Sequence, residues 1–166
     1  ILVTGGGGSI GSELCRQISK FKPKKLYILD IYENNAYELE LELKDQFPEI
    51  QYDVIIASVR DTKRITNLFK ALKPQIIFHA AAHKHVPLIE ANPREAIKNN
   101  IYGSCNVIKA AIESEAEKMV LISTDKAVNP TNVMGATKRF AEMLVQGYNQ
   151  QRKTELVAII VRNVLG

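Results

Sequence analysis

Six short apolar runs recur along the 166-residue chain, and amphipathic stretches separate them. Each run is rich in β-branched residues and apolar nearly throughout, which is typical of parallel strands covered on both faces. Strands that alternate with helices predict an α/β fold, a doubly wound parallel sheet with right-handed crossovers and helices on both faces. The predicted strands are Ile1–Val3, Leu26–Leu29, Val54–Ala57, Ile76–Phe78, Met119–Ile122 and Leu156–Val161.

The stretches between the strands carry apolar residues at helical spacing. Asn92 and Pro93 predict a helix start, with Asn as N-cap and Pro in the first turn, and this helix should reach about Glu113. A last helix should run from about Met134 to Gln151. The apolar faces of the earlier helices consist of Ile10, Leu14 and Ile18, then Leu39, Leu43 and Phe47, then Ile65, Leu68, Phe69 and Leu72.

Composition excludes several classes of protein. The chain is 46% hydrophobic and 24% charged, with a formal charge of +4, and its basic residues are scattered apart from Lys22–Lys25. Nucleic-acid surfaces need a basic stripe with interleaved aromatic residues, so we expect no nucleic-acid partner. No apolar run approaches the length of a membrane span. Cys15 and Cys105 fit a reducing compartment rather than a disulfide scaffold.

A glycine-rich turn joins the first strand to the first helix. Gly5, Gly8 and Gly11 are spaced by three residues at this junction. Such a turn lets a pyrophosphate approach bare backbone, and the helix N-terminus offers free N–H groups to the phosphates. We therefore predict dinucleotide binding by the three glycines together with Ser9 and Ile10.

The second predicted strand leads into Asp30, 19 positions beyond Gly11. A carboxylate at this place accepts hydrogen bonds from the adenosine ribose and repels a 2′-phosphate. Ile31–Glu33 follow, without an arginine that could hold such a phosphate. The sequence therefore favours NAD over NADP, although a carboxylate that merely ends a strand is the alternative.

Two further strand ends should complete the cofactor site, because ligands of doubly wound sheets bind outside the carboxyl ends of the strands. Ser58 and Val59 follow the third strand, where contacts to adenine are expected. Ala80, Ala81 and Ala82 follow the fourth, and such small residues let a cofactor lie across the strand tips.

After the fifth strand come Ser123–Pro130 and then Met134–Lys138. Here the chain resembles the extended short-chain dehydrogenases/reductases, and more narrowly the nucleotide-sugar 4,6-dehydratases of polysaccharide biosynthesis, of the UDP-N-acetylglucosamine type. The resemblance covers nearly the whole chain and is carried by Thr4–Gly11, His79–Pro87, Asn99–Gly103 and Ser123–Lys138. It implies an NAD(P)-binding Rossmann domain and a UDP-sugar substrate from capsule or related polysaccharide pathways.

The reaction that this resemblance implies is redox-neutral: oxidation at C4 by NAD, loss of water across C5–C6, and return of the hydride to C6. Elimination needs a base for the C5 proton and an acid for the leaving hydroxyl. We predict Lys126 as the base, Asp125 as the acid and Thr124 as the residue that binds the C4 hydroxyl. An ordinary surface ion pair after a strand is the alternative interpretation.

Met134 and Lys138 are four residues apart and share one helix face. In the wider superfamily a tyrosine holds the first position, and the lysine lowers its pKa and holds the nicotinamide ribose. Because methionine cannot transfer a proton, the group that deprotonates the C4 hydroxyl is left open. The larger, membrane-bound branch of the family is similar in having methionine there, which implies a cytoplasmic domain anchored through segments outside this chain.

Other predictions follow from the resemblance. Lys84 and Asn100 are expected at the cofactor, with Lys84 in the cleft between nicotinamide and substrate. Residues 1–166 should form one dinucleotide-binding domain of a longer, homo-oligomeric enzyme, whose substrate-binding portion lies C-terminal to them. The motif Val161–Gly166 is two residues shorter than is usual in the family.

Three alternatives stay open at this point. The chain could belong to a nucleotide-sugar C4 epimerase or reductase on the same scaffold, or to an NAD-binding module without chemistry. A zinc site formed by His79, His83 and His85 is the third, but their spacing matches no metalloenzyme motif and no cysteine joins them, so we expect no metal.

Overall fold

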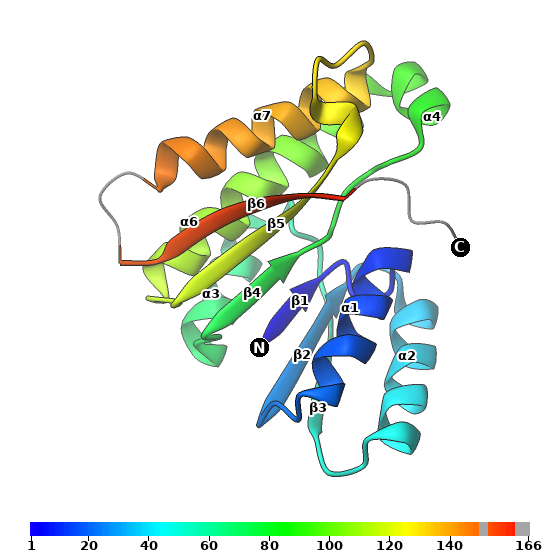
Figure 1. The fold of residues 1–166 in the computed structure, drawn as a ribbon, viewed down its shortest axis with the longest axis vertical. Helices are drawn as coiled ribbons and strands as arrows, with labels where there is room; N and C mark the ends of the chain where they lie inside the picture. Colours follow the sequence, from blue (N-terminus) through cyan, green and yellow to red (C-terminus); the bar gives the residue numbers. More distant parts are fainter. Residues whose placement is uncertain (150–152, 162–166) are drawn as a thin grey trace.

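The computed structural model describes residues 1–149 and 153–161 and contains one parallel sheet (Figure 1). The strand order is β3-β2-β1-β4-β5-β6, which confirms the predicted doubly wound fold. The strands are β1 (Leu2–Thr4), β2 (Lys25–Asp30), β3 (Gln51–Ile56), β4 (Ile76–His79), β5 (Lys118–Thr124) and β6 (Glu155–Val161).

Helices follow each of the first five strands, as the alternation predicts. They are α1 (Ser9–Lys20), α2 (Glu33–Gln46), α3 (Thr62–Leu72), α4 (Val86–Ala91), α5 (Pro93–Ala96), α6 (Ser104–Glu113) and α7 (Val133–Tyr148), with a π-helix η1 (Ile97–Gly103) and a 3-10 turn η2 (Asp125–Ala127). The π-helix joins α5 to α6, so the long helix predicted to follow Asn92 does exist.

The chain changes the side on which it adds strands between β1 and β4. From β1, the strands β2 and β3 follow toward one edge of the sheet, and β4, β5 and β6 follow toward the other. Thr4 pairs with Leu29 of β2 on one side and with His79 of β4 on the other. At such a switch point the loops after the two central strands diverge, which opens a crevice at the carboxyl edge of the sheet. The fold therefore places the glycine turn, Asp30 and the alanines after β4 around one opening.

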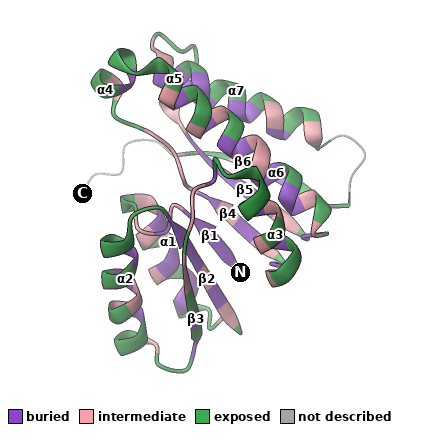
Figure 2. Ribbon diagram, turned by 180° about the vertical axis from the view of Figure 1, so that it is seen from behind, coloured by how far each residue is buried: buried purple, intermediate pink, exposed green. Residues whose placement is uncertain are grey.

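Two apolar cores lie on opposite faces of the sheet. The helices α3, α6 and α7 cover one face, where Phe69, Val107 and Leu121 are buried. The helices α1 and α2 cover the other face beside β1, β2 and β3, where Cys15 and Ile28 are buried. Figure 2 shows the resulting burial along the sheet and on the inner sides of the helices.

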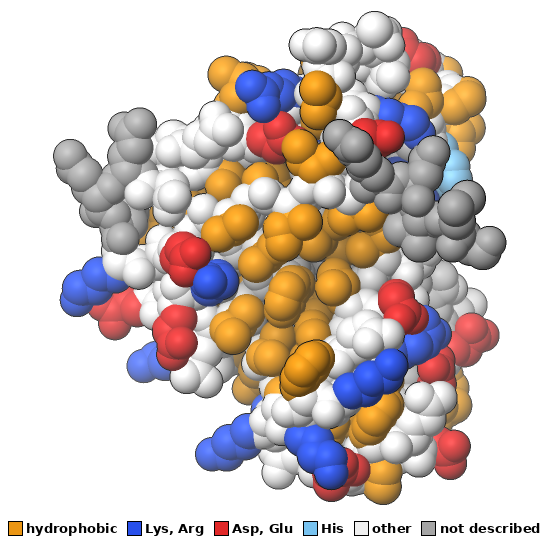
Figure 3. Space-filling view, in the orientation of Figure 1, with side chains coloured by type: hydrophobic (Ala, Val, Ile, Leu, Met, Phe, Trp, Pro, Cys, Tyr) orange, Lys and Arg blue, Asp and Glu red, His pale blue; other side chains and the backbone are white. Residues whose placement is uncertain are grey.

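One expectation about the strands is wrong. Ile159 and Ile160 in β6 are 45% and 47% exposed, although the apolar runs predicted cover on both faces. These two residues are consecutive, so they point to opposite faces of the sheet. Ile160 is exposed near the end of the edge strand, on the face that α3, α6 and α7 cover. Ile159 points to the other face, where the core under α1 and α2 extends no farther than Phe78 of β4, so within the described ranges no helix covers β5 and β6 there. Figure 3 shows the apolar side chains that gather there.

Helix boundaries differ from the sequence predictions in a few places. Asn92 holds the N-cap position of α5 and Pro93 its first turn, as predicted, but the Asn92 side chain donates to the carbonyl oxygen of Leu88 and forms no cap hydrogen bond. Helix α4 was not predicted. Helix α7 begins at Val133 as expected, whereas Gln151 and the shortened motif up to Gly166 lie outside the described residues. None of the described helices is both long and apolar enough to span a membrane.

Candidate active site

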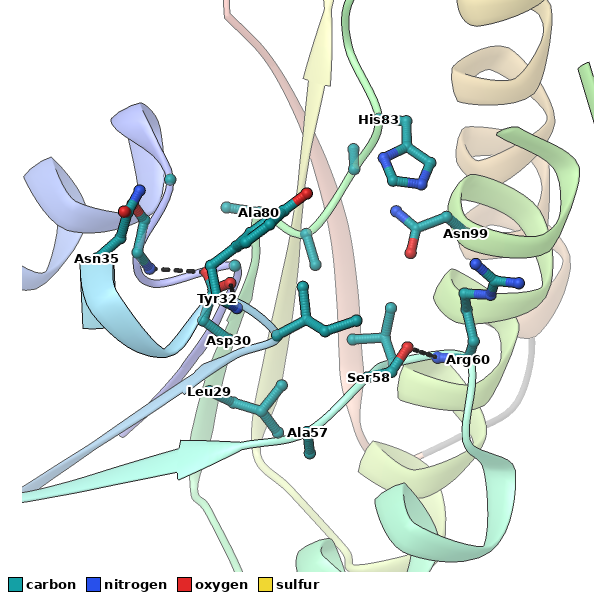
Figure 4. Close-up of a pocket in the computed structure, with 17 residues that line it drawn as sticks. Leu29, Asp30, Tyr32, Asn35, Ala57, Ser58, Arg60, Ala80, His83 and Asn99 are labelled. Carbon is teal, nitrogen blue, oxygen red and sulfur yellow. Dashed lines mark hydrogen bonds between the residues drawn. The ribbon is translucent and has the colours of Figure 1, made fainter. Parts of the chain in front are cut away.

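A cavity of about 440 Å³ opens at the carboxyl ends of the first four strands (Figure 4). The predicted cofactor residues that line it are Gly5, Gly8, Asp30, Ser58, Val59, Ala80, Ala81 and Ala82. Further lining residues that sequence reasoning missed include Gly7, Tyr32, Asn35, Arg60, His83 and Asn99. The cavity is thus bounded by the glycine turn, by three strand ends and by η1.

Close backbone packing explains why the turn needs glycines. Gly5 has a φ of +70°, and a Cβ on it would lie 2.6 Å from the backbone nitrogen of Ala81. A Cβ on Gly11 would lie 1.9 Å from the carbonyl oxygen of Gly5. These contacts press the turn against the end of β4 and the start of α1 against the turn. Gly8 then stands at the N-cap of α1 without a side chain, which leaves the first N–H groups of this helix accessible.

Asp30 is 6% exposed and has a structural role as well as a place in the cavity wall. Its Oδ2 accepts a hydrogen bond of 2.8 Å from the Gly7 N–H, and its Oδ1 accepts one of 2.9 Å from the Tyr32 N–H. Each carboxylate oxygen has a second lone pair, so each can accept a further hydrogen bond from a ribose hydroxyl. The carboxylate therefore both fixes the glycine turn to the end of β2 and presents negative charge to the cavity.

The wall opposite Asp30 carries polar side chains from the loop after β3, from η1 and from the loop after β4 (Figure 4). Ser58 Oγ accepts a hydrogen bond from the Arg60 N–H, and the Arg60 guanidinium pairs with Glu95 at 2.8 Å. His83 stands beside them, and burial together with the charge of Arg60 lowers its pKa. Ser58 was predicted at the cofactor, whereas Arg60 and His83 were not, because no local motif links loops that are distant in sequence.

Several predicted cofactor residues lie behind or beside the cavity rather than in its lining. Lys84 Nζ donates to Ser9 Oγ at 3.2 Å and so links the loop after β4 to the start of α1. Asn100 is 1% exposed; its Oδ1 accepts from the His83 N–H at 2.8 Å, and its Nδ2 donates to the His83 carbonyl at 3.0 Å. Asn100 thereby fixes the backbone of a residue that does line the cavity. Ile10 and Gly11 lie in the first turn of α1 and do not line the cavity.

A buried hydrogen-bonded chain joins β1, β4 and η1. Ser104 Oγ donates to the Asn100 carbonyl, so it accepts from His79 Nε2, and His79 Nδ1 accepts from the Thr4 hydroxyl. Burial lowers the pKa of His79 to about 3, with a smaller contribution from the charge of Lys138. His79 is therefore a neutral structural residue. The described residues contain no group of three or more His, Cys, Asp or Glu side chains that could hold a metal ion.

The segment after β5 lies on the same edge of the sheet as the cavity but does not line it. Because β5 pairs with β4 (His79 opposite Leu121), its end at Thr124 lies one strand beyond the alanines of the cavity wall. Thr124 Oγ1 donates to Asp125 Oδ1 at 3.0 Å. Asp125 is half-buried and Lys126 is exposed, and no ion pair joins them, both residues being among those described.

Lys138 and Met134 differ in their surroundings, although they share one helix. Lys138 is 8% exposed, and its Nζ donates to the Ile122 carbonyl at 2.6 Å. Burial lowers the pKa of Lys138 to about 8, and the charge of Glu142 opposes this shift. Met134 packs in a small apolar cluster with Ile89 and Ala96. An ammonium has three donors, so Lys138 keeps hydrogen-bonding capacity for a ligand.

A doubly wound parallel sheet, a glycine turn after β1 and a buried lysine on α7 define a Rossmann-fold domain of the short-chain dehydrogenase/reductase type. Within that class, the chain belongs to the polysaccharide biosynthesis protein family, whose model it matches over residues 1–166.

Three named proteins are similar to the chain over nearly its whole length. The chain is 54% identical to the capsular polysaccharide biosynthesis protein CapD of Staphylococcus aureus, over 100% of this chain and 28% of CapD. It is 36% identical to a UDP-N-acetylglucosamine 4,6-dehydratase (inverting) of Campylobacter jejuni, over 100% of this chain and 49% of the dehydratase. The X-ray structure of Pen from Bacillus thuringiensis superposes with a TM-score of 0.89 at 35% identity, over 99% of this chain and 52% of Pen. The chain thus spans about half or less of the length of these proteins.

Proposed function

We propose that the chain is the dinucleotide-binding part of an NAD-dependent 4,6-dehydratase that acts on UDP-N-acetylglucosamine or a close relative. One observation carries the proposal: a cavity suited to a dinucleotide ends at β4, and the acid, amine and hydroxyl of Asp125, Lys126 and Thr124 follow the neighbouring strand on the same edge. The similarity to the Campylobacter dehydratase supports the choice of substrate.

The residues present fit NAD. Helix α1 begins at a bare glycine, which suits a pyrophosphate, and the buried Asp30 carboxylate suits a ribose diol and opposes a 2′-phosphate. Bound NAD would accept a hydride from C4 of the sugar and return it to C6. Lys138, whose ammonium is already fixed at the Ile122 carbonyl, would hold the nicotinamide ribose from the side of α7.

The remaining steps fall to the segment after β5. Thr124 would bind the C4 hydroxyl, Lys126 would remove the proton at C5, and Asp125 would protonate the 6-hydroxyl as it leaves. Lys126 is exposed and free to approach a bound sugar, whereas Thr124 and Asp125 are held together by their hydrogen bond. Met134 would take no part in proton transfer.

Product analysis of the natural full-length protein with NAD and UDP-N-acetylglucosamine tests the proposal. A dehydratase forms a 4-keto-6-deoxy sugar without net change in NADH. A C4 epimer as product would show the sibling activity instead, and tight NAD binding without turnover would show a binding module.

Replacing Lys126 with Ala tests its role within that reaction. We expect dehydration to fall by about 10²–10⁴-fold, the usual contribution of a general base, while NAD affinity is unchanged. An unchanged rate would remove Lys126 as the C5 base. The homo-oligomer and the cytoplasmic, membrane-anchored setting stay predictions, which the size and the fractionation of the natural protein would test.

A further inference from the structure

Three residues on one face of helix α7 contact the end of β5 and the η2 turn that follows it. A Cβ on Gly135 would lie 2.2 Å from the Lys126 carbonyl oxygen, so the helix touches the backbone of η2 there. One turn later, Lys138 Nζ donates to the Ile122 carbonyl. One further turn along, Glu142 Oε1 accepts a hydrogen bond from the Ser123 hydroxyl. The positions 135, 138 and 142 have the spacing of a single helical stripe.

Of these three residues, Glu142 has no role in the proposed reaction, yet it is 4% exposed. Its second oxygen, Oε2, accepts a hydrogen bond of 2.9 Å from Arg139 Nη1, so both carboxylate oxygens are occupied. A buried carboxylate is costly unless it is paired and hydrogen-bonded, and an apolar residue often stabilises such a position better. A carboxylate at this place therefore needs an explanation other than stability.

The partners of Glu142 suggest what that explanation is. Ser123 is 3% exposed and directly precedes Thr124, Asp125 and Lys126. Lys138 lies one helical turn before Glu142 and bonds to Ile122, the residue before Ser123. Thus two consecutive residues of β5 are held by two side chains of α7 that are one turn apart.

We infer that Glu142 is a positioning residue of the candidate site: it fixes Ser123 ahead of the reacting segment and holds the Lys138 ammonium at the Ile122 carbonyl through its negative charge. The inference rests on the proposed function for what Thr124–Lys126 and Lys138 do. The hydrogen bonds of Glu142 and Lys138 to β5 are independent of that function, because they form in the protein without ligand.

The charges around Lys138 support this assignment. Burial lowers its pKa to about 8, and Glu142 is the group that opposes the shift. From β4, His79 faces the same lysine, but it is neutral because burial lowers its pKa to about 3. Without the charge of Glu142, Lys138 would lose its proton closer to neutral pH, and one of the donors that hold it between the helix and the strand would be lost.

The test uses the natural full-length protein and three variants. Glu142→Gln removes the charge but keeps an oxygen that can accept from Ser123, and Ser123→Ala removes the hydroxyl but keeps the charge. Glu113→Gln is the matched control, because it makes the same change on α6 at a side chain that is 50% exposed. The titration of Lys138 is followed by NMR of lysine labelled with ¹³C at Cε, with the signal assigned through Lys138→Arg.

We expect Glu142→Gln to raise the acid dissociation constant of Lys138 about tenfold, the lower end of what a neighbouring charge produces, while Glu113→Gln leaves it unchanged. We expect Ser123→Ala to leave this titration in place but to lower kcat about tenfold, with the Kd for NAD unchanged. A purely structural role of Glu142 would lower stability without moving the Lys138 titration.

Two results would overturn the inference. The first is a Lys138 titration that is the same in Glu142→Gln and Glu113→Gln. The second is full turnover by Ser123→Ala, and this result is the deciding test if Glu142→Gln does not fold. If Lys138 titrates as expected but the unmodified protein makes no keto sugar, the proposed function fails while the role of Glu142 in holding Lys138 stands.

Discussion

The two sides of the candidate site differ in the groups that form them: backbone on one side, polar side chains on the other. On the side of β1–β4, the cavity is made mainly of backbone: a glycine turn in which Gly5 and Gly11 leave no room for a Cβ, small alanines, and one carboxylate bound to two N–H groups. On the side of β5 and α7, polar side chains predominate, and their hydrogen bonds join the helix to the strand: Glu142 accepts from Ser123, and Lys138 donates to the Ile122 carbonyl. The proposed function assigns the cofactor to the first side and the reaction to the second.

This difference predicts how each side responds to change. A backbone site should be lost at once when a Cβ is added, because no side chain can move aside. A side-chain site should lose activity in steps while the fold and the cofactor affinity persist. Variants that add a Cβ or remove a charge therefore test this difference.

The largest effect is expected for Gly11→Ala. The new Cβ would lie 1.9 Å from the Gly5 carbonyl oxygen, so either α1 or the turn must shift. We expect unfolding free energy to fall by about 1–3 kcal/mol or more and NAD binding to be lost. Urea unfolding and calorimetric titration with NAD measure the two effects. Retained NAD affinity would show that the turn is not the phosphate site.

A smaller effect is expected for Asp30→Asn. The amide cannot accept hydrogen bonds at both atoms, so either Gly7 or Tyr32 loses its partner, and the negative charge disappears. We expect NAD affinity to fall by about 10- to 100-fold, in line with the loss of a hydrogen bond to a charged group. Discrimination against NADP should weaken at the same time. A ratio of the two Kd values like that of the parent protein would argue against contact between Asp30 and the ribose.

His79 should make stability depend on pH. Its pKa is about 3 in the folded protein and near 6.5 when unfolded, so the stability that the neutral ring contributes is fully present above pH 6.5 and is lost as the pH falls toward 3. Between pH 7.5 and pH 5 we expect a loss of roughly 1–2 kcal/mol from this group.

Urea midpoints for the parent and for His79→Gln measure that loss. The pKa of His83 is also lowered, so it contributes in the same direction, and the difference between the two proteins isolates His79. Lys138 does not interfere, because its folded pKa of about 8 lies above this window. Equal pH dependence in both proteins would contradict the neutral, buried ring.

The smallest effect is expected for Gly147→Ala, which serves as the control for Gly11→Ala. A Cβ at Gly147 meets nothing within 4 Å, and this residue lies in the last turn of α7. Since glycine within a helix costs about 0.5–1 kcal/mol relative to alanine, the variant should be slightly more stable. Its NAD affinity and turnover should equal those of the parent.

The same contrast explains what the sequence could predict. Gly5, Gly8, Asp30 and the alanines after β4 do meet at one cavity, because local spacing and strand order suffice for a site made of backbone; that they bind the cofactor stays a prediction. Arg60, His83 and Asn99 were missed, because they meet only through tertiary packing. Asn100 and Lys84 make supporting contacts beside the cavity, and their predicted contact with the cofactor stays a prediction.

For β5 and α7, the residues proposed for catalysis came from resemblance rather than from spacing. The sequence carried no signal for the pairing of Glu142 with Ser123, which are 19 positions apart and joined only when α7 packs on the sheet. The exposed face of β6 was also unpredicted, since apolar strands look alike whether or not a helix covers them.

The central claim is that a dinucleotide spans both sides, with its adenosine at Asp30 and its nicotinamide beside Thr124–Lys126. A crystal structure of the natural full-length protein with NAD and UDP tests it most directly. The account predicts the ribose diol within hydrogen-bond distance of Asp30 and the nicotinamide next to Lys138 and the end of β5. A nicotinamide that points away from β5 would contradict it.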